Sequence, residues 1–261
     1  MAIIIVFCLS AYEIYSTTEV ITHNNKHNGN TLKIVHYNRH YNLQNHENMI
    51  KWIEEQNPDI FIVQETGETH SVAIKGLLNT YPHQVHKSDK GAFGFVLASK
   101  HKIISSRIHQ DKKYVLNNIY VHARIKLPDG NIISVYASHP PPPVSYALQK
   151  QRNENLKAIA SEINNDDDKS IIFMGDWNIT QYSPYFKDLL DSTGLQNQHT
   201  SPYPQPTWPS TFITSILQIP IDHILHKGDL TLINKNRSHH LGSDHYPIIA
   251  EFSLNKPSNN I

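Results

Sequence analysis

The sequence predicts an α/β fold in which two sheets pack against each other and helices cover them on the outside. Short apolar runs of strand length alternate along the chain with stretches of helical spacing. Further short strands follow close together near the C-terminus. Interleaved strands and helices, followed by such late strands, are typical of domains built from layers around packed sheets.

The composition fits a folded globular domain and argues against several classes of protein. Hydrophobic residues make up 39% of the 261 residues, which is enough for a core without metal or disulfide staples. The one cysteine, Cys8, excludes a disulfide framework and a cysteine-rich zinc site. Lys plus Arg is 23 and Asp plus Glu is 23. This balance argues against a strongly basic surface that binds nucleic acid along its length, but it does not exclude a local basic patch. The 18 histidines do not by their number indicate a metal.

The N-terminal segment leaves the cellular location open. Residues 3–9 form an unbroken apolar run, which is far shorter than the roughly 20 residues of a membrane-spanning helix. The run fits the apolar part of a short signal peptide, although the basic segment before it is missing. A buried first strand or an inaccurately assigned start is the alternative. We expect export or membrane tethering, with residues 1–30 as the apolar segment and a polar linker.

The strands and helices of the folded domain begin at residue 32. Residues 32–37 alternate in polarity and predict a strand, and residues 49–53 carry apolar side chains at the spacing of a helix that ends at Asn57. Residues 59–63 form a continuous apolar run, which indicates a strand buried on both faces. A short helix is expected at residues 72–78 and a strand at residues 93–98.

A hairpin is predicted where Asp129-Gly130 lies between two apolar segments, residues 118–127 and 131–138, since Asp-Gly suits a tight turn. The prolines of residues 140–143 then break the chain. The remaining elements are a helix at residues 146–164, a strand at 171–174, a helix at 182–190, and strands at 221–226, 230–234 and 247–252.

An acidic loop follows the predicted helix at residues 146–164. Its three consecutive carboxylates, Asp166, Asp167 and Asp168, look like a metal cluster. Consecutive carboxylates at a helix end usually face solvent, so we expect no metal there.

Polar residues recur where the predicted strands end or begin. They are Asn38, Gln64 and Glu65, His139, Asp176 and Asn178, Asp222 and His223, and Ser243 to His245. Each alone is a weak signal, because an Asp after a strand is usually a turn residue. Their occurrence in this order at strand ends over one domain favours a catalytic site held on a rigid sheet.

Three of these motifs occur together: Gln64-Glu65, Gly175-Asp176-Trp177-Asn178 and Ser243-Asp244-His245. With them the chain resembles the endonuclease/exonuclease/phosphatase superfamily, with the fold of pancreatic deoxyribonuclease. The resemblance covers residues 32–252. It implies a DNase I-like four-layer α/β sandwich, in which helices flank two mostly antiparallel sheets and the site lies at one end of the sheets. The catalytic domain would span residues 31–255, and residues 256–261 would form a tail.

The resemblance also implies a metal side of the site. Glu65 would be the principal ligand of Mg²⁺ or Mn²⁺, in keeping with the preference of such cations for carboxylate oxygens. Asn38 and Asp244 would lie beside the metal and help to place it. Asn42 competes for the amide role, and we prefer Asn38 because it directly follows the apolar strand.

The remaining implied roles concern the phosphate and the attacking water. Asp176 would orient or deprotonate the water, and Asn178 would contact the phosphate. His245 would face the phosphate as an acid or an electrostatic clamp, with its ring oriented by Asp222. His139 would be a second phosphate-facing histidine.

Two features of this side of the site stay open. No acidic partner of His139 can be identified, since Asp111 is the nearest candidate and a solvent-facing turn is the better interpretation of it. Trp177 is expected to pack in the interior. Trp208, in a proline-rich loop, lines the substrate groove or anchors its loop.

We therefore expect a metal-dependent hydrolase that cleaves phosphodiester bonds, either a nuclease or a phosphodiesterase acting on phospholipids or small molecules. The alternative is a non-catalytic binding protein on the same scaffold, which the filled catalytic positions disfavour. A serine hydrolase is not supported, because no Gly-x-Ser-x-Gly elbow is present. No protein partner is implied, and a monomer is expected.

The substrate class can be narrowed by charge. A duplex-DNA enzyme must hold several phosphates with Lys and Arg. Between the motifs only scattered basic residues occur, such as Lys112-Lys113 and residues 150–152, the latter on a helix expected to lie away from the site. The segments that link the motifs are also short. These features predict weak DNA binding and a small or membrane-presented phosphodiester as substrate.

Overall fold

The computed structural model describes residues 19–21, 30–43, 45–89, 91–111, 118–201, 205–211 and 217–254. The N-terminal apolar run with Cys8, most of the linker, Lys112-Lys113 and the tail lie outside the described residues, so the predictions that concern them stay predictions. Within the described part of the chain, every helix is too short or too polar to span a bilayer.

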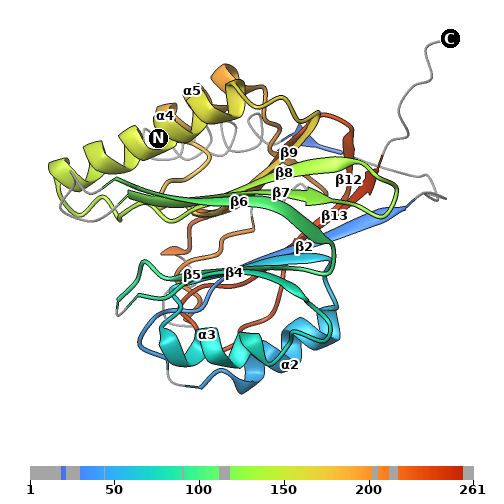
Figure 1. The fold of residues 1–261 in the computed structure, drawn as a ribbon. Helices are drawn as coiled ribbons and strands as arrows, with labels where there is room; N and C mark the ends of the chain where they lie inside the picture. Colours follow the sequence, from blue (N-terminus) through green and yellow to red (C-terminus); the bar gives the residue numbers. More distant parts are fainter. Residues whose placement is uncertain are drawn as a thin grey trace, which may run out of the picture.

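The first main sheet has six strands in the order β12-β13-β2-β3-β5-β4. Its strands are β2 (Thr31–Asn38), β3 (Ile60–Gln64), β4 (His83–Lys87), β5 (Phe95–Ser99), β12 (Leu230–Arg237) and β13 (Ile248–Leu254). Only the central pair, β2 and β3, is parallel. Helices α2 (Glu47–Gln56) and α3 (Glu68–Lys75) cover its outer face (Figure 1).

The second main sheet has five strands in the order β11-β9-β8-β7-β6. They are β6 (Lys102–Asp111), β7 (Asn118–Lys126), β8 (Ile132–Ser138), β9 (Ser170–Asp176) and β11 (Asp222–Lys227), and only β8 and β9 run parallel. Helices α4 (Tyr146–Asn164) and α5 (Pro184–Thr193) cover the outer face of this sheet (Figure 1). Two short strands, β1 (Glu19–Val20) and β10 (Gln198–His199), form a separate parallel pair.

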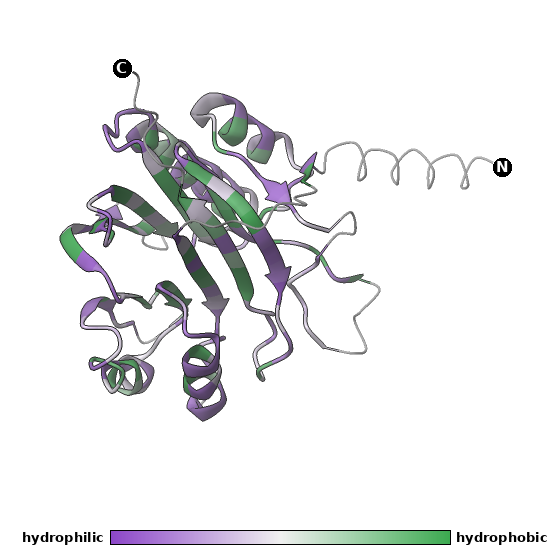
Figure 2. Cartoon of the chain, turned by 90° about the vertical axis from the view of Figure 1, so that its right-hand side faces the viewer, coloured by the Kyte–Doolittle hydropathy of each residue, from purple (hydrophilic) through white to green (hydrophobic). Residues whose placement is uncertain are grey.

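Three apolar clusters hold the layers together. The largest lies between the two sheets, where Ile34 and Ile62 of one pack with Val135 and Met174 of the other. A second cluster joins the six-stranded sheet to its helices, and a third joins the five-stranded sheet to α4 and α5. Along the strands, hydrophobic and hydrophilic stretches alternate (Figure 2). The predicted four-layer α/β sandwich with two mostly antiparallel sheets is therefore confirmed.

Most elements lie where the sequence predicts them, and the helix at residues 146–164 has the predicted bounds. The predicted hairpin is present, with Asn131 N donating to Asp129 Oδ1 in its turn. Four strands of the described residues were missed: β4, β6 and the two-residue strands β1 and β10. Strand β6 is mostly exposed along its length, so it lacks the apolar run that marks a buried strand.

The acidic loop is better paired than expected. Arg124 donates two 2.7 Å hydrogen bonds to Asp168, and the Tyr136 hydroxyl donates to Asp166 at 2.6 Å. Solvent exposure is thus the wrong interpretation for these two carboxylates, while Asp167 is exposed. Through these bonds, Asp166 and Asp168 attach the loop after α4 to strands β7 and β8. This cluster is not among the groups of described residues that could hold a metal ion.

The topology gathers strand ends from both sheets at one edge. In the first sheet the parallel register pairs Asn38 with Gln64, at the last residue of each strand. In the second sheet Asp176 at the end of β9 pairs with Asp222 at the start of β11. The side chain of Gln64 joins the two sheets, because its Nε2 donates to Ser138 O and its Oε1 accepts from Asp176 N.

A glycine permits this close approach of strands. Gly175 has a φ of +148°, and a Cβ atom at this position would lie 2.1 Å from Ser138 O. A side chain there cannot be accommodated without moving backbone. The Gly-Asp-x-Asn motif therefore begins with glycine because the end of β9 presses against the end of β8.

Candidate active site

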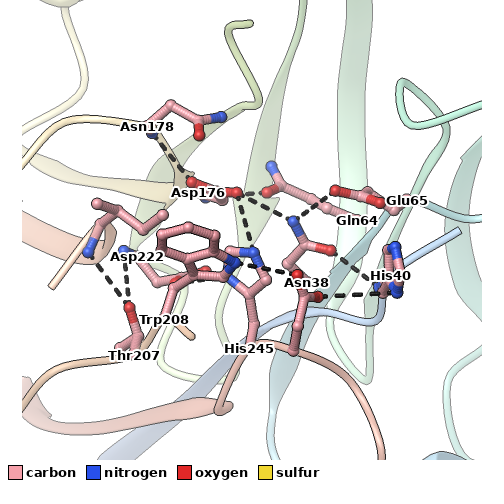
Figure 3. A network of polar contacts seen from close by, with 12 residues as sticks. Asn38, His40, Gln64, Glu65, Asp176, Asn178, Thr207, Trp208, Asp222 and His245 are labelled. Atoms are coloured by element: carbon pink, nitrogen blue, oxygen red, sulfur yellow. Dashed lines mark hydrogen bonds and ion pairs between the residues drawn. The ribbon is translucent and has the colours of Figure 1, made fainter. Parts of the chain in front are cut away.

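A cleft of about 510 Å³ opens at the edge where the strand ends meet. Its polar lining includes Glu65, His139, Asp176, Asn178, Asp244 and His245. Of the eight residues that the sequence assigns to the site, six thus line one cleft. The other two, Asn38 and Asp222, are buried directly behind it and hydrogen-bond to lining residues (Figure 3).

Asn38 connects the two central carboxylates. Its Nδ2 donates to Glu65 Oε1 at 2.8 Å and to Asp176 Oδ2 at 3.0 Å (Figure 3). Its Oδ1 accepts the backbone N–H of His40. The amide therefore holds the carboxylates with its nitrogen, while its oxygen is engaged by the chain. Asn42 is exposed and takes no part in this network.

Glu65 is held at both oxygens. Besides the bond from Asn38, Oε2 accepts the backbone N–H of Tyr41 at 2.9 Å. Its φ of +59° lies in the left-handed region, which is uncommon for a residue other than glycine. Such conformations persist where the surroundings fix them, and they cluster at functional sites. The strain here turns the carboxylate out of the end of β3 toward the cleft.

Asp176 is the centre of the polar network. Its Oδ2 lies 3.3 Å from His139 Nε2 and 3.6 Å from His245 Nε2, and its Oδ1 accepts Asn178 N at 3.0 Å. Burial alone raises the pKa of this carboxyl, but His245 and His139 outweigh it and lower the pKa below its ordinary value. Asp176 is thus ionised at neutral pH.

His139 has a backbone partner in place of the carboxylate that the sequence could not supply. Its Nδ1–H donates to Ala92 O at 3.0 Å, which leaves Nε2 facing Asp176. Burial lowers the pKa of the ring, but Asp176 and then Glu65 raise it above the ordinary histidine value overall. Asp111, at the end of β6, is exposed and lies in a strand, so the interpretation of a turn was wrong.

His245 is oriented by a buried carboxylate. Its Nδ1–H donates to Asp222 Oδ2 at 2.9 Å. Burial lowers the pKa of His245, yet Asp222 and Asp176 together raise it to about 10. Thr207 in turn places Asp222, because Thr207 Oγ1 accepts the backbone N–H groups of Ile221 and Asp222.

Asn178 sits at the end of the same motif in a left-handed conformation, with φ +52°. Its Nδ2 donates to Pro140 O at 3.0 Å, and its own carbonyl accepts from Arg152 Nη1 at 2.8 Å. The expectation that residues 150–152 lie away from the site is therefore wrong for Arg152. Its guanidinium is buried below Asn178 and also bonds to Asn153. Helical spacing alone could not reveal this, because the contact depends on how α4 packs.

Asp244 lies at the rim of the cleft. Its Oδ2 accepts Trp208 Nε1 at 3.0 Å, and its Oδ1 is 3.9 Å from His40 Nδ1. Trp208 has both of the roles that the sequence left open, because its side chain lines the cleft and its indole N–H anchors the loop to Asp244. Trp177, by contrast, is fully buried against Phe173, as expected.

One buried residue behind the site was missed. His36 on β2 lies with Nε2 3.0 Å from Gln64 Oε1 and Nδ1 3.5 Å from Asp222 Oδ1. Among the described residues, neither His36 Nδ1 nor Asp222 Oδ1 has a hydrogen-bond partner. Burial lowers the pKa of His36. Its position in an alternating strand gave no signal, because the two residues it contacts come from two distant segments, β3 and β11.

The donor set fits a hard divalent cation. Ligand atoms of Glu65, His139 and Asp176 lie within 4.8 Å of one another, as do those of Asp176, Asp222 and His245. Carboxylate oxygens at this density repel each other unless cations or protons are present. Glu65 and Asp176 would hold the metal, with the Asn38 amide nitrogen bridging the two carboxylates. Asp244 is not in either group of the described residues, so its role at the metal stays a prediction.

The match to a family model agrees with this chemistry. Residues 40–245 match the Endonuclease/Exonuclease/phosphatase family. The class of protein is therefore a hydrolase acting on phosphoesters, a class that generally uses a divalent metal. More particularly, the chain belongs to the endonuclease/exonuclease/phosphatase family. No curated protein matches it.

Solved structures of low sequence identity share the fold. A protein of this family from Beutenbergia cavernae is 16% identical with a TM-score of 0.72, over 86% of this chain and 72% of that one. TDP2 from D. rerio, in complex with a single-stranded DNA product, is 16% identical with a TM-score of 0.73, over 86% and 99%. A mannosyl-6-phosphatase from Bacteroides thetaiotaomicron is 17% identical with a TM-score of 0.70, over 85% and 100%.

Proposed function

We propose that this protein hydrolyses phosphodiester bonds in the cleft, with Mg²⁺ or Mn²⁺ as cofactor. The observation that carries the proposal is the convergence on Asp176 of Asn38 and two histidines from three different strand ends. Positive imidazoles, amide donors and carboxylates are the groups that such a reaction needs around one phosphate.

The reaction adds a water oxygen to phosphorus and breaks one phosphorus–oxygen ester bond. The departing alkoxide takes up a proton and leaves as an alcohol, and the attacking water gives up a proton. A bound divalent cation supplies positive charge for the phosphate oxygens. The residues Glu65 and Asp176 would hold it.

Asp176 orients the attacking water as a hydrogen-bond acceptor. Its depressed pKa makes it a weak proton acceptor, so orientation suits it better than full deprotonation. His245, with a pKa of about 10, stays charged at neutral pH and acts as an electrostatic clamp on the phosphate. Asp176 and Glu65 raise the pKa of His139 above its ordinary value, which favours the charged form of a second imidazole beside the same oxygen of Asp176. The amide of Asn178 offers a further donor at the cleft wall.

A chromogenic diester tests the proposal. Hydrolysis of bis(p-nitrophenyl) phosphate should require Mg²⁺ or Mn²⁺, stop on chelation and resume when metal is restored. Asp176→Asn should lower kcat by about 10²-fold or more, since the charge that orients the water is lost. Asp191→Asn, on the exposed face of α5, is the matched control and should keep full activity. Full activity in excess chelator would overturn the metal requirement, and no hydrolysis with either metal would favour the non-catalytic binding protein.

Export or membrane tethering by residues 1–30 and a monomeric state are further parts of the proposal. They rest on the sequence alone. Fractionation of cells that express the full chain, and sedimentation of the purified chain, test these two parts directly.

A further inference from the structure

We infer that the cleft takes a phosphoester joined to an apolar group, so that the substrate is an amphiphile with one phosphate. The inference deepens the proposed function and rests on it. It concerns the part of the cleft that lies beyond the phosphate-facing groups and that the chemistry of hydrolysis leaves unused.

The cleft has two chemically distinct parts. Carboxylates and imidazoles line one part. Apolar side chains line most of the rest and come from three connections. Phe93 lies between β4 and β5, Pro142 and Val144 lie between β8 and α4, and Trp208, Ile219 and Ile221 lie between β10 and β11. A volume of about 510 Å³ exceeds what a phosphate group needs, so an apolar portion of substrate has room beside it.

The apolar character continues out of the cleft. Among the large hydrophobic residues of the described chain, the three most exposed are Tyr146, Val144 and Leu217, at 81%, 80% and 72%. Val144 lines the cleft itself, Tyr146 follows it by two residues, and Leu217 precedes Ile219 by two. Exposed apolar residues that form one patch mark a binding surface, whereas exposed apolar residues that are scattered singly are normal and need no explanation.

Charge argues against a polyanionic substrate. No Lys or Arg is among the described residues that line the cleft. The nearby guanidiniums are engaged elsewhere, since Arg39 bonds to Leu43 O and Arg152 to Asn178 O. A nucleic acid needs cations for several successive phosphates. The two histidines of this cleft can face one phosphate, and the apolar residues that line the rest of it favour a hydrocarbon group.

Chain length provides the test. We compare p-nitrophenyl methyl phosphate with p-nitrophenyl hexyl phosphate, which share the reacting bond. Each methylene that becomes buried should improve kcat/KM by about fourfold, so the hexyl ester should be favoured by tenfold or more. Equal values, or a preference for the methyl ester, would overturn the inference while leaving the proposed function intact.

Variants locate the effect in the apolar wall. Val144→Ser and Ile219→Ser should collapse the preference for the hexyl ester. Val72→Ser is the matched control, because Val72 is 60% exposed on α3, outside the cleft lining. The control should leave the preference unchanged. Retention of the full preference in both cleft variants would overturn the inference.

Binding separates this inference from catalysis. In calorimetry with the Asp176→Asn variant, hexyl phosphate should bind more tightly than methyl phosphate, whether or not any ester is hydrolysed. Equal affinities would contradict the inference on their own. Absence of hydrolysis with either metal would contradict the proposed function alone.

A last comparison distinguishes the two sources of such an amphiphile. Dihexanoyl phosphatidylcholine is presented as dissolved monomers and dioleoyl phosphatidylcholine as vesicles. Faster cleavage of the vesicle lipid assigns the apolar rim to a bilayer surface. Cleavage of the monomers alone assigns it to a dissolved amphiphile. Both outcomes support the inference, and cleavage of neither, with the methyl ester cleaved well, counts against it.

Discussion

His245 Nδ1 and Asp222 Oδ2 lie 2.9 Å apart, and both groups are buried. The two residues reach each other from opposite sheets, since Asp222 begins β11 and His245 precedes β13. The bond fixes which nitrogen of the ring faces the cleft. It also couples the charge of the ring to a carboxylate that has no contact with solvent.

This pair should behave as one unit. Asp222→Asn keeps the shape but removes the charge that supports the imidazolium, and His245→Ala removes the ring. Each single variant should lose about 10²–10⁴-fold in kcat/KM. The double variant should lose little more than the worse single variant, as steady-state kinetics on the chromogenic diester will show. Losses that multiply would show that the two residues act independently.

Removal of the Glu65 charge should weaken metal binding more than it weakens the fold. Glu65→Gln keeps the oxygen that accepts from Asn38 or Tyr41 but lowers the attraction for a cation. The Mn²⁺ affinity measured by calorimetry should fall at least tenfold, and excess metal should restore part of the activity. Glu68→Gln, exposed in the first turn of α3, serves as the control. Unchanged Mn²⁺ affinity in the Glu65 variant would remove Glu65 from the metal site.

Arg152 should support the position of Asn178. Arg152→Ala leaves Asn178 O and Asn153 Oδ1 without their buried donor, which costs about 1–3 kcal/mol in free energy of unfolding. Catalysis should fall as well, because the strained Asn178 loses its anchor. Urea unfolding and kcat measure the two effects. Lys150→Ala, exposed on the same helix, should change neither, and equal behaviour of the two variants would contradict this role.

Lys235 should make stability rise with pH. Burial lowers its pKa from 10.5 to about 7, while Nζ donates to Asn197 and to Ile224 O. Between these two values the unfolded chain binds a proton that the folded chain does not. The free energy of unfolding therefore rises as the pH increases from about 7 to 10.5.

The comparison with Lys235→Met isolates this contribution. Relative to that variant, the wild type should gain about 1 kcal/mol per pH unit within the window. Urea unfolding at several pH values measures both chains. If the free energies of unfolding of wild type and variant changed with pH in parallel, the charge of Lys235 would be the same in the folded and the unfolded chain, which contradicts the prediction.

Duplex DNA should bind weakly. With the Asp176→Asn variant, the dissociation constant near physiological salt should be about 1 µM or weaker, and its dependence on salt should be shallow. Fluorescence anisotropy across a salt series measures both quantities. Submicromolar binding, with a salt dependence as steep as several phosphate contacts produce, would contradict this prediction and indicate that nucleic acid is the main substrate.

The buried strands and the motifs at their ends were predictable from the sequence. An apolar run such as that of β3 is recognisable from its composition, and Glu65 and Asp176 each lie two residues after the last apolar residue of such a run. The exposed strand β6 could not be found in this way, because it contributes little to the core. Local pattern therefore identifies what is buried and fails where a strand is held mainly by its neighbours.

Contacts between distant segments were beyond the reach of local pattern. The backbone partner of His139 is Ala92, which carries no chemical signal in the sequence. Arg152 and His36 likewise gain their roles from the packing of α4 and the pairing of the two sheets. Each of these contacts depends on the register in which the layers meet, and register is a property of the assembled fold.

The tight contact between Gly175 and Ser138 O limits which residues can occupy position 175. A methyl group at position 175 would act as a wedge between the end of β9 and the end of β8. It would part His139 from Asp176 without altering either of them, so reactivity would vanish while every reacting group was still present. Among full-length chains selected for hydrolysis from a library randomised at this codon, glycine should therefore be the only survivor.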